Sequence, residues 1–550
     1  MSGRERPGRE MSGHGTPGQG RSGPASTGSR GAAGGQLSRD LFGAATVMMA
    51  AFLLSRLTGL FRTVAISYQF GTGPQLDAYF AANRLSDTLF QVVAGGAVSA
   101  AFIPVLAAYL TRGQRAEAWR MVSALVSIAV GLMVPLSLAL ALLAPLVVRL
   151  WGGFDPAQHE LAVGMLRILL ISPTAFALGT LLTSVLNAEG RFLLAALAPS
   201  AYNLGIIFGA LVLSRWYGVR GLAIGAALGA LCYLLVQLPG MVQVGLRLRP
   251  WLGLGDPGVR RVGKLMAPRA LGLAVTQLNF LVISVLASPI EGAITALDYG
   301  WTLMMLPLGL FAMAISTAVF PTLAAQTASD ELGEMTRTLV GALRVILYLT
   351  VPAAAGLMLL GGPIVQALLE RGEFGPASAG LTVVALRFYA IGLPGQATVE
   401  IVTRAFYALH DTRTPVAVAA LAMATNFLLG LLLRPWLGHG GLALALSVAS
   451  LLEAGLLVGL ARRRLRDLDA ARLLASAGRS LAGAAVLALA LALVAGPVER
   501  LIEASGQVER LAILAVAVAV GATVYVVATL ALRAEEPRQL FGLARRGLGS

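Results

Sequence analysis

Residues 121–148 read MVSALVSIAVGLMVPLSLALALLAPLVV, a run without one charged side chain. As a helix this run would rise about 40 Å, which exceeds the roughly 30 Å thickness of the hydrocarbon core of a bilayer. It lacks the alternation of apolar and polar residues that a membrane-spanning strand needs. We therefore predict that it crosses a membrane as an α-helix, which satisfies its own backbone hydrogen bonds.

Similar apolar runs follow one another along the chain from about residue 41. The 550 residues are 57% hydrophobic and 13% charged, and their mean hydropathy is +0.77, which is far from the composition of soluble domains. The pattern predicts an all-α integral membrane protein of about fourteen transmembrane helices. We expect them at residues 41–66, 79–109, 121–148, 161–187, 192–214, 221–245, 265–289, 293–324, 338–361, 380–409, 415–433, 440–461, 476–496 and 509–533.

Arginine in the loops predicts the orientation, because cytoplasmic loops of membrane proteins are enriched in Lys and Arg. Basic clusters follow the second, sixth and twelfth predicted helices, at Arg112, Arg115, Arg120, Arg247, Arg249, Arg260, Arg261, Lys264, Arg462, Arg463, Arg464, Arg466 and Arg472. The alternate loops 71–77 and 151–160 contain neither residue. Both termini are therefore expected in the cytoplasm. The net charge of +15 does not indicate nucleic acid, since the arginines lie in short loops or inside spans.

The sequence contains an internal repeat. Residues 97–108 and 314–325 match at seven of twelve positions without a gap, and both copies contain a proline, Pro104 and Pro321. Residues 183–191 and 403–413 are alike at nearly the same offset. Because six predicted helices separate the copies, the two halves are expected to have the same orientation around an axis along the membrane normal, with a cavity between them. A chance match of Ala/Leu-rich helices is the alternative.

We divide the chain accordingly into four parts. Residues 1–38 are rich in Gly, Ser, Pro and Arg and are predicted to be a disordered cytoplasmic tail, in which Met1 and Met11 are both possible starts. Two pseudo-symmetric six-helix lobes follow, at 39–248 and 249–465. Residues 466–550 contain two additional C-terminal helices and a cytoplasmic tail.

Four arginines lie in predicted spans: Arg56 and Arg62 in the first, Arg84 in the second and Arg269 at the start of the seventh. A guanidinium in hydrocarbon is costly, so each must face a wet cavity, a counter-ion or the interface. An anionic substrate would explain all four, and the planar fork of arginine suits phosphate. Snorkelling from a span end, or pairing with Asp77 or Asp87, remains the alternative, above all for Arg84 and Arg269.

The spacing of the first two arginines constrains their geometry. On a regular helix Arg56 and Arg62 are separated by about 9 Å of rise and about 240° of rotation. They share a face only if the helix is distorted, which Gly59 could permit. We regard Gly59, Gly95, Gly96 and Pro307 as hinge candidates, with ordinary small-residue packing of helices as the alternative.

The sequence shows no catalytic or metal-binding motif. The four histidines are scattered, the single cysteine is Cys232, and the sequence contains neither an HExxH motif nor a Walker A loop. We predict no catalytic residue, no resident metal and no ATP hydrolysis. The loop carboxylates Glu370, Glu373 and Asp411 are interpreted as solvated.

Several motifs jointly resemble the MviN/MurJ family of lipid II flippases, in order from residue 41 to about 465. The N-terminal ones are Ser55-Arg-Leu-Thr-Gly-Leu-Phe-Arg62, Phe70-Gly-Thr-Gly73, Asp77-Ala-Tyr79 and Gly96-Ala-Val-Ser-Ala-Ala-Phe-Ile-Pro104. The later ones are Pro268-Arg-Ala-Leu-Gly-Leu273, Leu306-Pro-Leu-Gly309, Phe320-Pro-Thr-Leu323, Glu370-Arg-Gly-Glu-Phe374 and Arg404-Ala-Phe-Tyr-Ala-Leu-His-Asp-Thr-Arg-Thr-Pro415.

The resemblance implies the fold of the multidrug/oligosaccharidyl-lipid/polysaccharide exporter superfamily, with the two extra helices forming a groove for a polyprenyl tail. It implies a flippase of the bacterial inner membrane that moves lipid II to the outer face by alternating access, for cell-wall synthesis, with lipid II and membrane lipids as its partners. Arg56 and Arg62 would bind the diphosphate, together with Ser55, Arg84 and Arg269, and Asp77 would lie near the outward gate.

This sequence departs from the family pattern at several cavity positions. Phe90, Gln91 and Thr302 stand where we associate arginines with the family, Gly95 replaces an acid, and Thr63 replaces an aspartate. Arg84 or Arg269 could compensate. The coupling ion is unassigned, with Asn279 and Asn426 as weak candidates and the membrane potential as another possible driving force.

Three alternatives stay open at this point: a flippase for another polyprenyl-linked glycan, a drug or ion antiporter of the same superfamily, and a membrane-embedded transferase. An antiporter for cations would need buried acids, whereas the ionic residues in the spans are chiefly arginines. A transferase would need paired acids or a His/Asp pair at a membrane face, and the sequence shows no such constellation.

Overall fold

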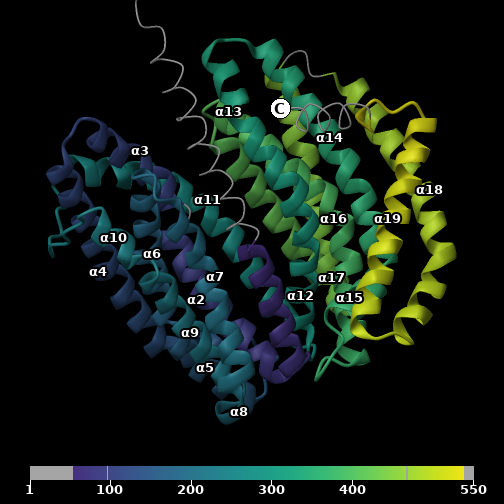
Figure 1. Cartoon of the computed structure of the whole chain (residues 1–550), viewed down its shortest axis with the longest axis horizontal. Helices are drawn as coiled ribbons and strands as arrows, with labels where there is room; N and C mark the ends of the chain where they lie inside the picture. Colours follow the sequence, from purple (N-terminus) through teal and green to yellow (C-terminus); the bar gives the residue numbers. More distant parts are fainter. Residues whose placement is uncertain (1–53, 96, 466–468, 538–550) are drawn as a thin grey trace, which may run out of the picture. The chain divides into compact units, whose positions relative to one another are not determined.

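The computed structural model describes residues 54–95, 97–465 and 469–537. The chain divides into two units, 1–50 and 51–550, and the described residues all belong to the second. The secondary structure of the described residues is helical, without strands (Figure 1). Ten helical stretches among them are long and apolar enough to cross a membrane. The all-helical membrane fold is thus confirmed, whereas the count of fourteen crossings stays a prediction. The predicted tail at 1–38 and Gly96 lie outside the described residues.

The first half begins with a helix over residues 54–70. It continues with α2 Pro74–Ala94, α3 Ala97–Thr111, α4 Arg115–Val148, α5 Pro156–Leu169, α6 Ile171–Ala188, α7 Phe192–Phe208, η1 Gly209–Leu213, α8 Ser214–Tyr217, α9 Val219–Leu235 and α10 Leu238–Gln243. The second half and the C-terminal pair comprise α11 Pro257–Ala287, α12 Ala293–Pro307, η2 Leu308–Met313, α13 Ala314–Ala328, α14 Leu332–Leu359, α15 Gly361–Leu368, α16 Pro376–Ala408, α17 Arg413–Arg464, α18 Ala470–Glu503 and α19 Gln507–Ala531.

A helix is interrupted in each half, by an extended residue in the first and by π-helical turns in the second. In the first half the helix breaks at Gly95, between α2 and α3. In the second half the corresponding helix changes at Pro307 into the π-helical segment η2 before α13 continues. Pro104 and Pro321, the prolines of the sequence repeat, lie inside α3 and α13. The duplication that the sequence predicted is therefore visible in the backbone.

A second repeated feature was missed in the sequence. Gly218 (φ 56°, ψ −141°) and Gly438 (φ 58°, ψ −138°) adopt the same left-handed conformation, each within a Trp-x-Gly-x-x-Gly-Leu-Ala motif. Gly438 divides the 52-residue α17 into two helical arms. The tryptophans that start the motifs, Trp216 and Trp436, are 70% and 84% exposed. This positive φ is easily adopted only by glycine, which explains why both copies keep it.

Small residues bring α7 and α9 into close contact. A Cβ added at Gly205 would lie 2.3 Å from the Cα of Gly229, and one at Gly225 would lie 2.4 Å from the Cα of Gly209. Because lipid is as apolar as the helix surface, tight backbone contact rather than a hydrophobic driving force stabilises such pairs. The glycines thus fix α7 against α9, which positions a polar residue of α7 described below.

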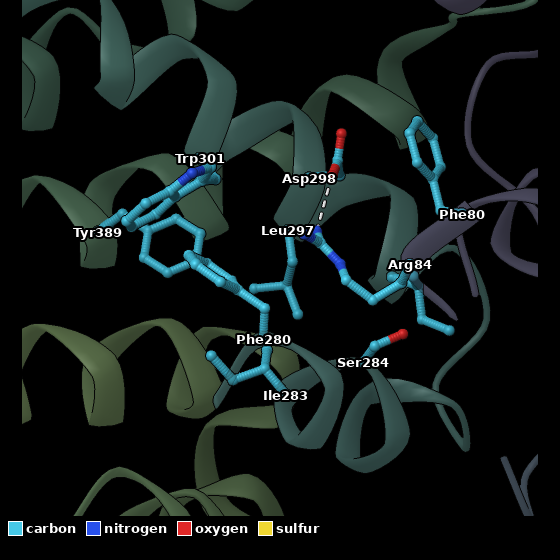
Figure 2. Close-up of a pocket in the computed structure, with 10 residues that line it drawn as sticks. Phe80, Arg84, Phe280, Ile283, Ser284, Leu297, Asp298, Trp301 and Tyr389 are labelled. Carbon is cyan, nitrogen blue, oxygen red and sulfur yellow. Dashed lines mark hydrogen bonds and ion pairs between the residues drawn. The ribbon is translucent and has the colours of Figure 1, made fainter. Parts of the chain in front are cut away.

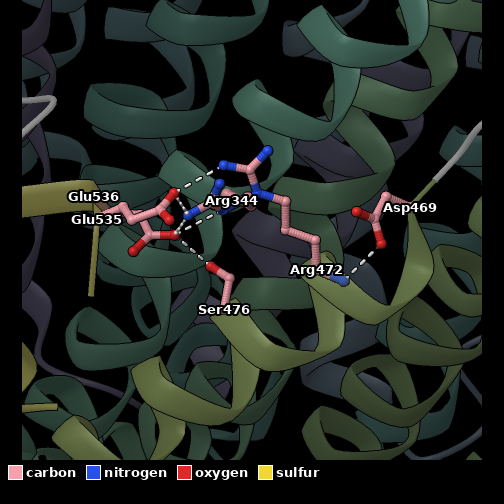
Figure 3. Close-up of polar contacts among 6 residues, drawn as sticks. All are labelled: Arg344, Asp469, Arg472, Ser476, Glu535 and Glu536. Atoms are coloured by element: carbon pink, nitrogen blue, oxygen red, sulfur yellow. Dashed lines mark hydrogen bonds and ion pairs between the residues drawn. The ribbon is translucent and has the colours of Figure 1, made fainter. Parts of the chain in front are cut away.

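The C-terminal helices α18 and α19 pack on each other and on α14 (Figure 1). A buried ionic cluster holds them at one end (Figure 3). Arg344 of α14, 6% exposed, pairs with Glu536, 1% exposed, at 2.6 Å and with Glu535 at 3.0 Å. Ser476 of α18 donates to Glu536, and Arg472 pairs with Glu535 at 3.0 Å. The segment after α19 therefore ties the helix pair to the second half.

Candidate substrate site and inter-half seam

The two halves meet at a seam formed by the loops and helix starts around residues 68–77, 151–154, 284–295 and 369–378. Gly71 (φ +62°) and Gly372 (φ +60°) make the closest approach there. A Cβ at Gly71 would lie 2.4 Å from the carbonyl oxygen of Glu373, and one at Gly372 would lie 2.3 Å from that of Tyr68. The backbone N–H of Glu373 donates to the Tyr68 carbonyl at 2.9 Å. Both glycines belong to motifs of the family resemblance, and the fold brings these motifs together.

Polar side chains add further ties across the seam. The Thr72 Oγ1 donates to the Ser378 Oγ at 2.8 Å, and the Thr72 backbone N–H donates to the same oxygen at 3.0 Å. Trp151, fully buried, donates from Nε1 to the Ser284 Oγ at 2.9 Å. These contacts join residues that are more than a hundred positions apart, and they close this end of the molecule.

Asp77, the predicted gate residue, lies at the seam. It is 2% exposed, and its Oδ1 accepts hydrogen bonds from the backbone N–H of Thr295 at 2.8 Å and from the Thr295 Oγ1 at 2.7 Å. Thr295 is in the first turn of α12, where backbone N–H groups have no partner within the helix. A carboxylate from α2 therefore caps α12 and interacts favourably with its dipole.

Arg84 is held across the two halves by a residue that the sequence did not single out (Figure 2). Its Nη2 lies 3.2 Å from Oδ1 of Asp298 on α12, with side-chain exposures of 24% and 25%. Its Cζ lies 5.1 Å from the ring centroid of Phe280 on α11, a cation–π contact. From the sequence, Asp77 and Asp87 were considered as partners of Arg84. The ion pair is with Asp298 instead, which lies 214 positions away in the sequence. The pair borders a cavity of about 30 Å³, also lined by Phe80, Trp301 and Tyr389.

Arg62 is oriented by an amide. Its Nη1 donates at 3.2 Å to Oδ1 of Asn203, which is a 6% exposed residue of α7. The Nδ2 of Asn203 donates to the Thr58 Oγ1 at 3.2 Å and to the Ser55 carbonyl at 3.4 Å. Asn203 therefore binds three positions of the first helix and orients Arg62 without forming an ion pair with it. Asn203 could not be singled out from the sequence, because its partners are more than 140 positions away.

Arg56 faces the second half. It is exposed, its Nη2 approaches the Met313 Sδ at 3.9 Å, and a Cβ at Gly309 would lie 3.6 Å from the same nitrogen. The guanidinium of Arg56 thus lies beside η2, where a Cβ at Gly309 would make only an ordinary van der Waals contact with it. Within the part of the chain that the structure describes, neither Arg56 nor Arg62 forms an ion pair with a carboxylate. The helix runs through Gly59 without a break, and the two arginines reach different helices.

The remaining predicted positions divide into three groups. Arg269 lies in α11, and its side chain lies outside the described part. The ring of Phe90 packs at a tilt against Phe176, with 5.3 Å between the ring centroids, and Gln91 hydrogen-bonds Asp87. Thr302 is half-buried on α12. An aromatic contact and an amide thus replace two expected charges.

Asn279 and Asn426 bond directly to each other, with the Asn426 Nδ2 donating to the Asn279 Oδ1 at 2.6 Å. Among the described residues there is no group of three or more His, Cys, Asp or Glu side chains that could hold a metal ion. The electrostatic features of the site are therefore those of the arginines and of the carboxylates that face them.

The described residues form a helical membrane protein in which two halves meet at one end and arginines lie between them. Solved structures share this fold. A structure titled "Lipid II flippase MurJ, inward closed conformation" matches 90% of this chain and 100% of its own, with a TM-score of 0.74 at 24% identity. An inward-facing multidrug resistance MATE family transporter of the MOP superfamily covers 77% of this chain and 98% of its own, with a TM-score of 0.65 at 15% identity.

Sequence comparison is more specific. The model of the lipid II flippase MurJ family matches residues 66–531, and the chain belongs to this family. A probable lipid II flippase MurJ of Haemophilus influenzae is 34% identical over 432 residues, which are 74% of this chain and 84% of the relative. A protein of the same description from Vibrio cholerae is 32% identical over 76% of this chain and 83% of its own length.

Proposed function

We propose that this protein is a flippase that moves lipid II, the undecaprenyl-diphosphate-linked precursor of peptidoglycan, from the cytoplasmic to the outer face of the bacterial inner membrane by alternating access. The observation that carries the proposal is the pair of guanidinium groups on the first helix, Arg56 and Arg62, which lack a carboxylate partner among the described residues. Unpaired arginines inside a membrane bundle fit a ligand with phosphate oxygens.

The closed seam supports the same cycle. If the arginine-rich loops face the cytoplasm, the seam around Asp77 lies at the outer face. A head group could then enter from the cytoplasm, and the hydrogen bonds of Asp77 with Thr295 and of Thr72 with Ser378 would have to open before it left. Family membership and the names of the relatives favour lipid II as the cargo. An ion gradient or the membrane potential would drive the cycle.

Replacing the arginines tests the proposal directly. We expect Arg56→Ala and Arg62→Ala to abolish lipid II translocation in proteoliposomes, measured as exposure of fluorescent lipid II to an impermeant quencher, without loss of membrane insertion. Arg337→Ala is the matched control, because Arg337 is 76% exposed and pairs only with Glu334 one turn away on its own helix. Full activity of the Arg56 and Arg62 variants would contradict the anion-binding role.

The cargo itself requires a cellular test, because Phe90 and Gln91 make the charged site smaller than the family pattern implies. After depletion of the protein in its host, lipid II should accumulate on the cytoplasmic face. If lipid II still reaches the outer face while another polyprenyl-linked glycan accumulates inside, the protein carries that glycan instead.

A further inference from the structure

Among the residues that the structure describes, one ion pair joins the two halves. Arg84 of α2 belongs to the first half and Asp298 of α12 to the second. The other ion pairs of the described residues connect positions within one half, or connect the C-terminal helices with the second half. The Arg84–Asp298 pair lies on the same two helices as the contact of Asp77 with Thr295, one turn further along α12.

We propose that Asp298 is the counter-ion that the substrate diphosphate displaces from Arg84, so that substrate binding itself releases the ion pair that locks the halves at the seam. This inference rests on the proposed flippase function and adds to it a trigger for opening. Three features support the release: the single hydrogen bond of the pair, the charges around it and the space beside it.

A phosphate can replace Asp298 as the hydrogen-bond acceptor of Arg84. The guanidinium of Arg84 donates one hydrogen bond, at 3.2 Å, to Oδ1 of Asp298 within the described part of the chain. Arginine has five N–H donors in a planar fork and binds phosphate through two of them at once. The face of Phe280 at 5.1 Å supports the cation whichever anion it binds. Exchange of Asp298 for a diphosphate would therefore increase the number of charge-assisted hydrogen bonds.

Nearby charges favour the exchange once an anion is bound. Asp298 lies within electrostatic range of both Arg84 and Arg62, and so does Asp87. A diphosphate on Arg62 would attract Arg84 and repel Asp298, which pulls the two members of the pair in opposite directions.

The cavity beside the pair makes the exchange incompatible with the closed seam. Its volume of about 30 Å³ has room for a water molecule or two. A diphosphate held by two nitrogens of Arg84 would need the position that Asp298 now occupies. Arg84 can therefore bind the diphosphate only after it has moved away from α12. Binding of the diphosphate to Arg84 therefore requires α2 and α12 to separate.

Thr72 and Ser378 provide a reporter of the closed state, since their hydroxyl oxygens are 2.8 Å apart across the seam. In a Cys232→Ser background, Thr72→Cys and Ser378→Cys should form a disulfide rapidly when the seam is closed. We expect lipid II in proteoliposomes to slow disulfide formation about fivefold, the effect of losing one partly exposed ion pair. Lipid II should have little effect once Asp298→Asn is added, because that variant is already slow without substrate.

A double-mutant cycle isolates the pair. Arg84→Gln, Asp298→Asn and the combined variant should all slow disulfide formation to a similar extent, because each removes the same interaction. Glu453→Gln, an acid-to-amide change within one half on α17, is the control and should leave the rate unchanged. Additive effects in the combined variant, or a parent rate that Asp298→Asn does not alter, would overturn the lock.

The translocation rate and the disulfide rate respond separately to failure of the flippase and to failure of the ion-pair lock. If the protein translocates lipid II but lipid II leaves the rate of disulfide formation unchanged, the substrate-operated release is refuted. The proposed flippase function would still stand. Absence of translocation in the parent protein would count against the flippase, while the cycle without lipid II would still decide whether the ion pair locks the seam.

Discussion

Asn203 shows how an uncharged side chain can hold a charged one without neutralising it. Its amide accepts from Arg62 and donates to the Thr58 hydroxyl and the Ser55 carbonyl, so it orients the arginine and keeps its full positive charge available. A carboxylate at the same place would hold Arg62 equally well but would compete with an anionic ligand.

This comparison leads to a test by substitution. We expect Asn203→Asp to lower lipid II translocation at least about tenfold, because the new carboxylate would pair with Arg62. Asn203→Ala should have a smaller effect, since the guanidinium loses its orientation but not its charge. The measurement is the initial translocation rate at equal amounts of reconstituted protein. If the Asn203→Asp variant were more active than the Asn203→Ala variant, the anion-binding role of Arg62 would be contradicted.

Gly71 gives a second prediction. Alanine there would have to adopt φ +62° with its Cβ 2.4 Å from the Glu373 carbonyl oxygen, so Gly71→Ala should separate the seam and lower the rate of the Thr72→Cys/Ser378→Cys disulfide severalfold. Gly73→Ala is the matched control: its φ of 167° is ordinary extended backbone, and its Cβ would meet nothing within 4 Å. Equal rates in the two variants would show that the close approach does not hold the seam.

The contact of α7 with α9 determines where Asn203 lies. Gly225 of α9 faces Gly209 with no space for a side chain, whereas Gly131 of α4 faces open space. Gly225→Ala should therefore cost about 1–3 kcal/mol through overpacking and lower the midpoint of thermal unfolding in detergent by several degrees. Gly131→Ala should leave the midpoint unchanged or raise it slightly. A similar midpoint for both variants would mean that α7 and α9 can move apart at little cost.

The breaks in α2–α3 and α12–η2–α13 fall where the hinge candidates Gly95 and Pro307 were expected, whereas the helix at Gly59 is continuous. Pro307 cannot donate a backbone hydrogen bond, and the widened π-helical turns of η2 follow it directly. Whether these positions bend during transport stays a prediction. Their symmetry suggests that corresponding helices of both halves would bend at corresponding depths.

The ionic cluster behind α19 makes the attachment of the C-terminal helices sensitive to pH. Hydrogen bonds from Arg344 and Arg472 hold the pKa of Glu535 below its ordinary value of 4.5. The pKa of Glu536 is also lowered, because hydrogen bonds from Ser476 and Arg344 outweigh its burial. A carboxylate with a depressed pKa stabilises the folded state above pH 4.5 and loses this contribution as the pH falls through the lowered value.

We therefore expect hydrogen exchange in residues 531–537 to be slow at pH 7 and to increase, after correction for intrinsic rates, as the pH falls below 4.5 through the lowered pKa values of Glu535 and Glu536. Glu536→Gln should increase it already at pH 7, since Arg344 then loses its buried counter-ion. Glu334→Gln, which affects only a surface pair, serves as the control. Protection that is independent of pH and of Glu536 would refute the ionic attachment.

Sequence alone predicted the parts of the molecule that depend on local pattern. The apolar runs predicted the helices, and the repeat around Pro104 and Pro321 predicted the two halves. Both signals are local patterns that can be read directly from the order of the residues. The partners of the arginines could not be predicted in this way. Asn203 and Asp298 reach Arg62 and Arg84 only through the packing of α7 and α12, and no spacing in the sequence encodes these distances.

The duplicated turns at Gly218 and Gly438 have a practical consequence. Each follows an exposed tryptophan, Trp216 or Trp436, and indoles prefer the headgroup layer of a bilayer. The two rings thus act as matched depth markers, one on each half. In a variant that keeps only these two tryptophans, quenching of fluorescence by brominated lipids would report whether one half tilts relative to the other during turnover, without any added dye.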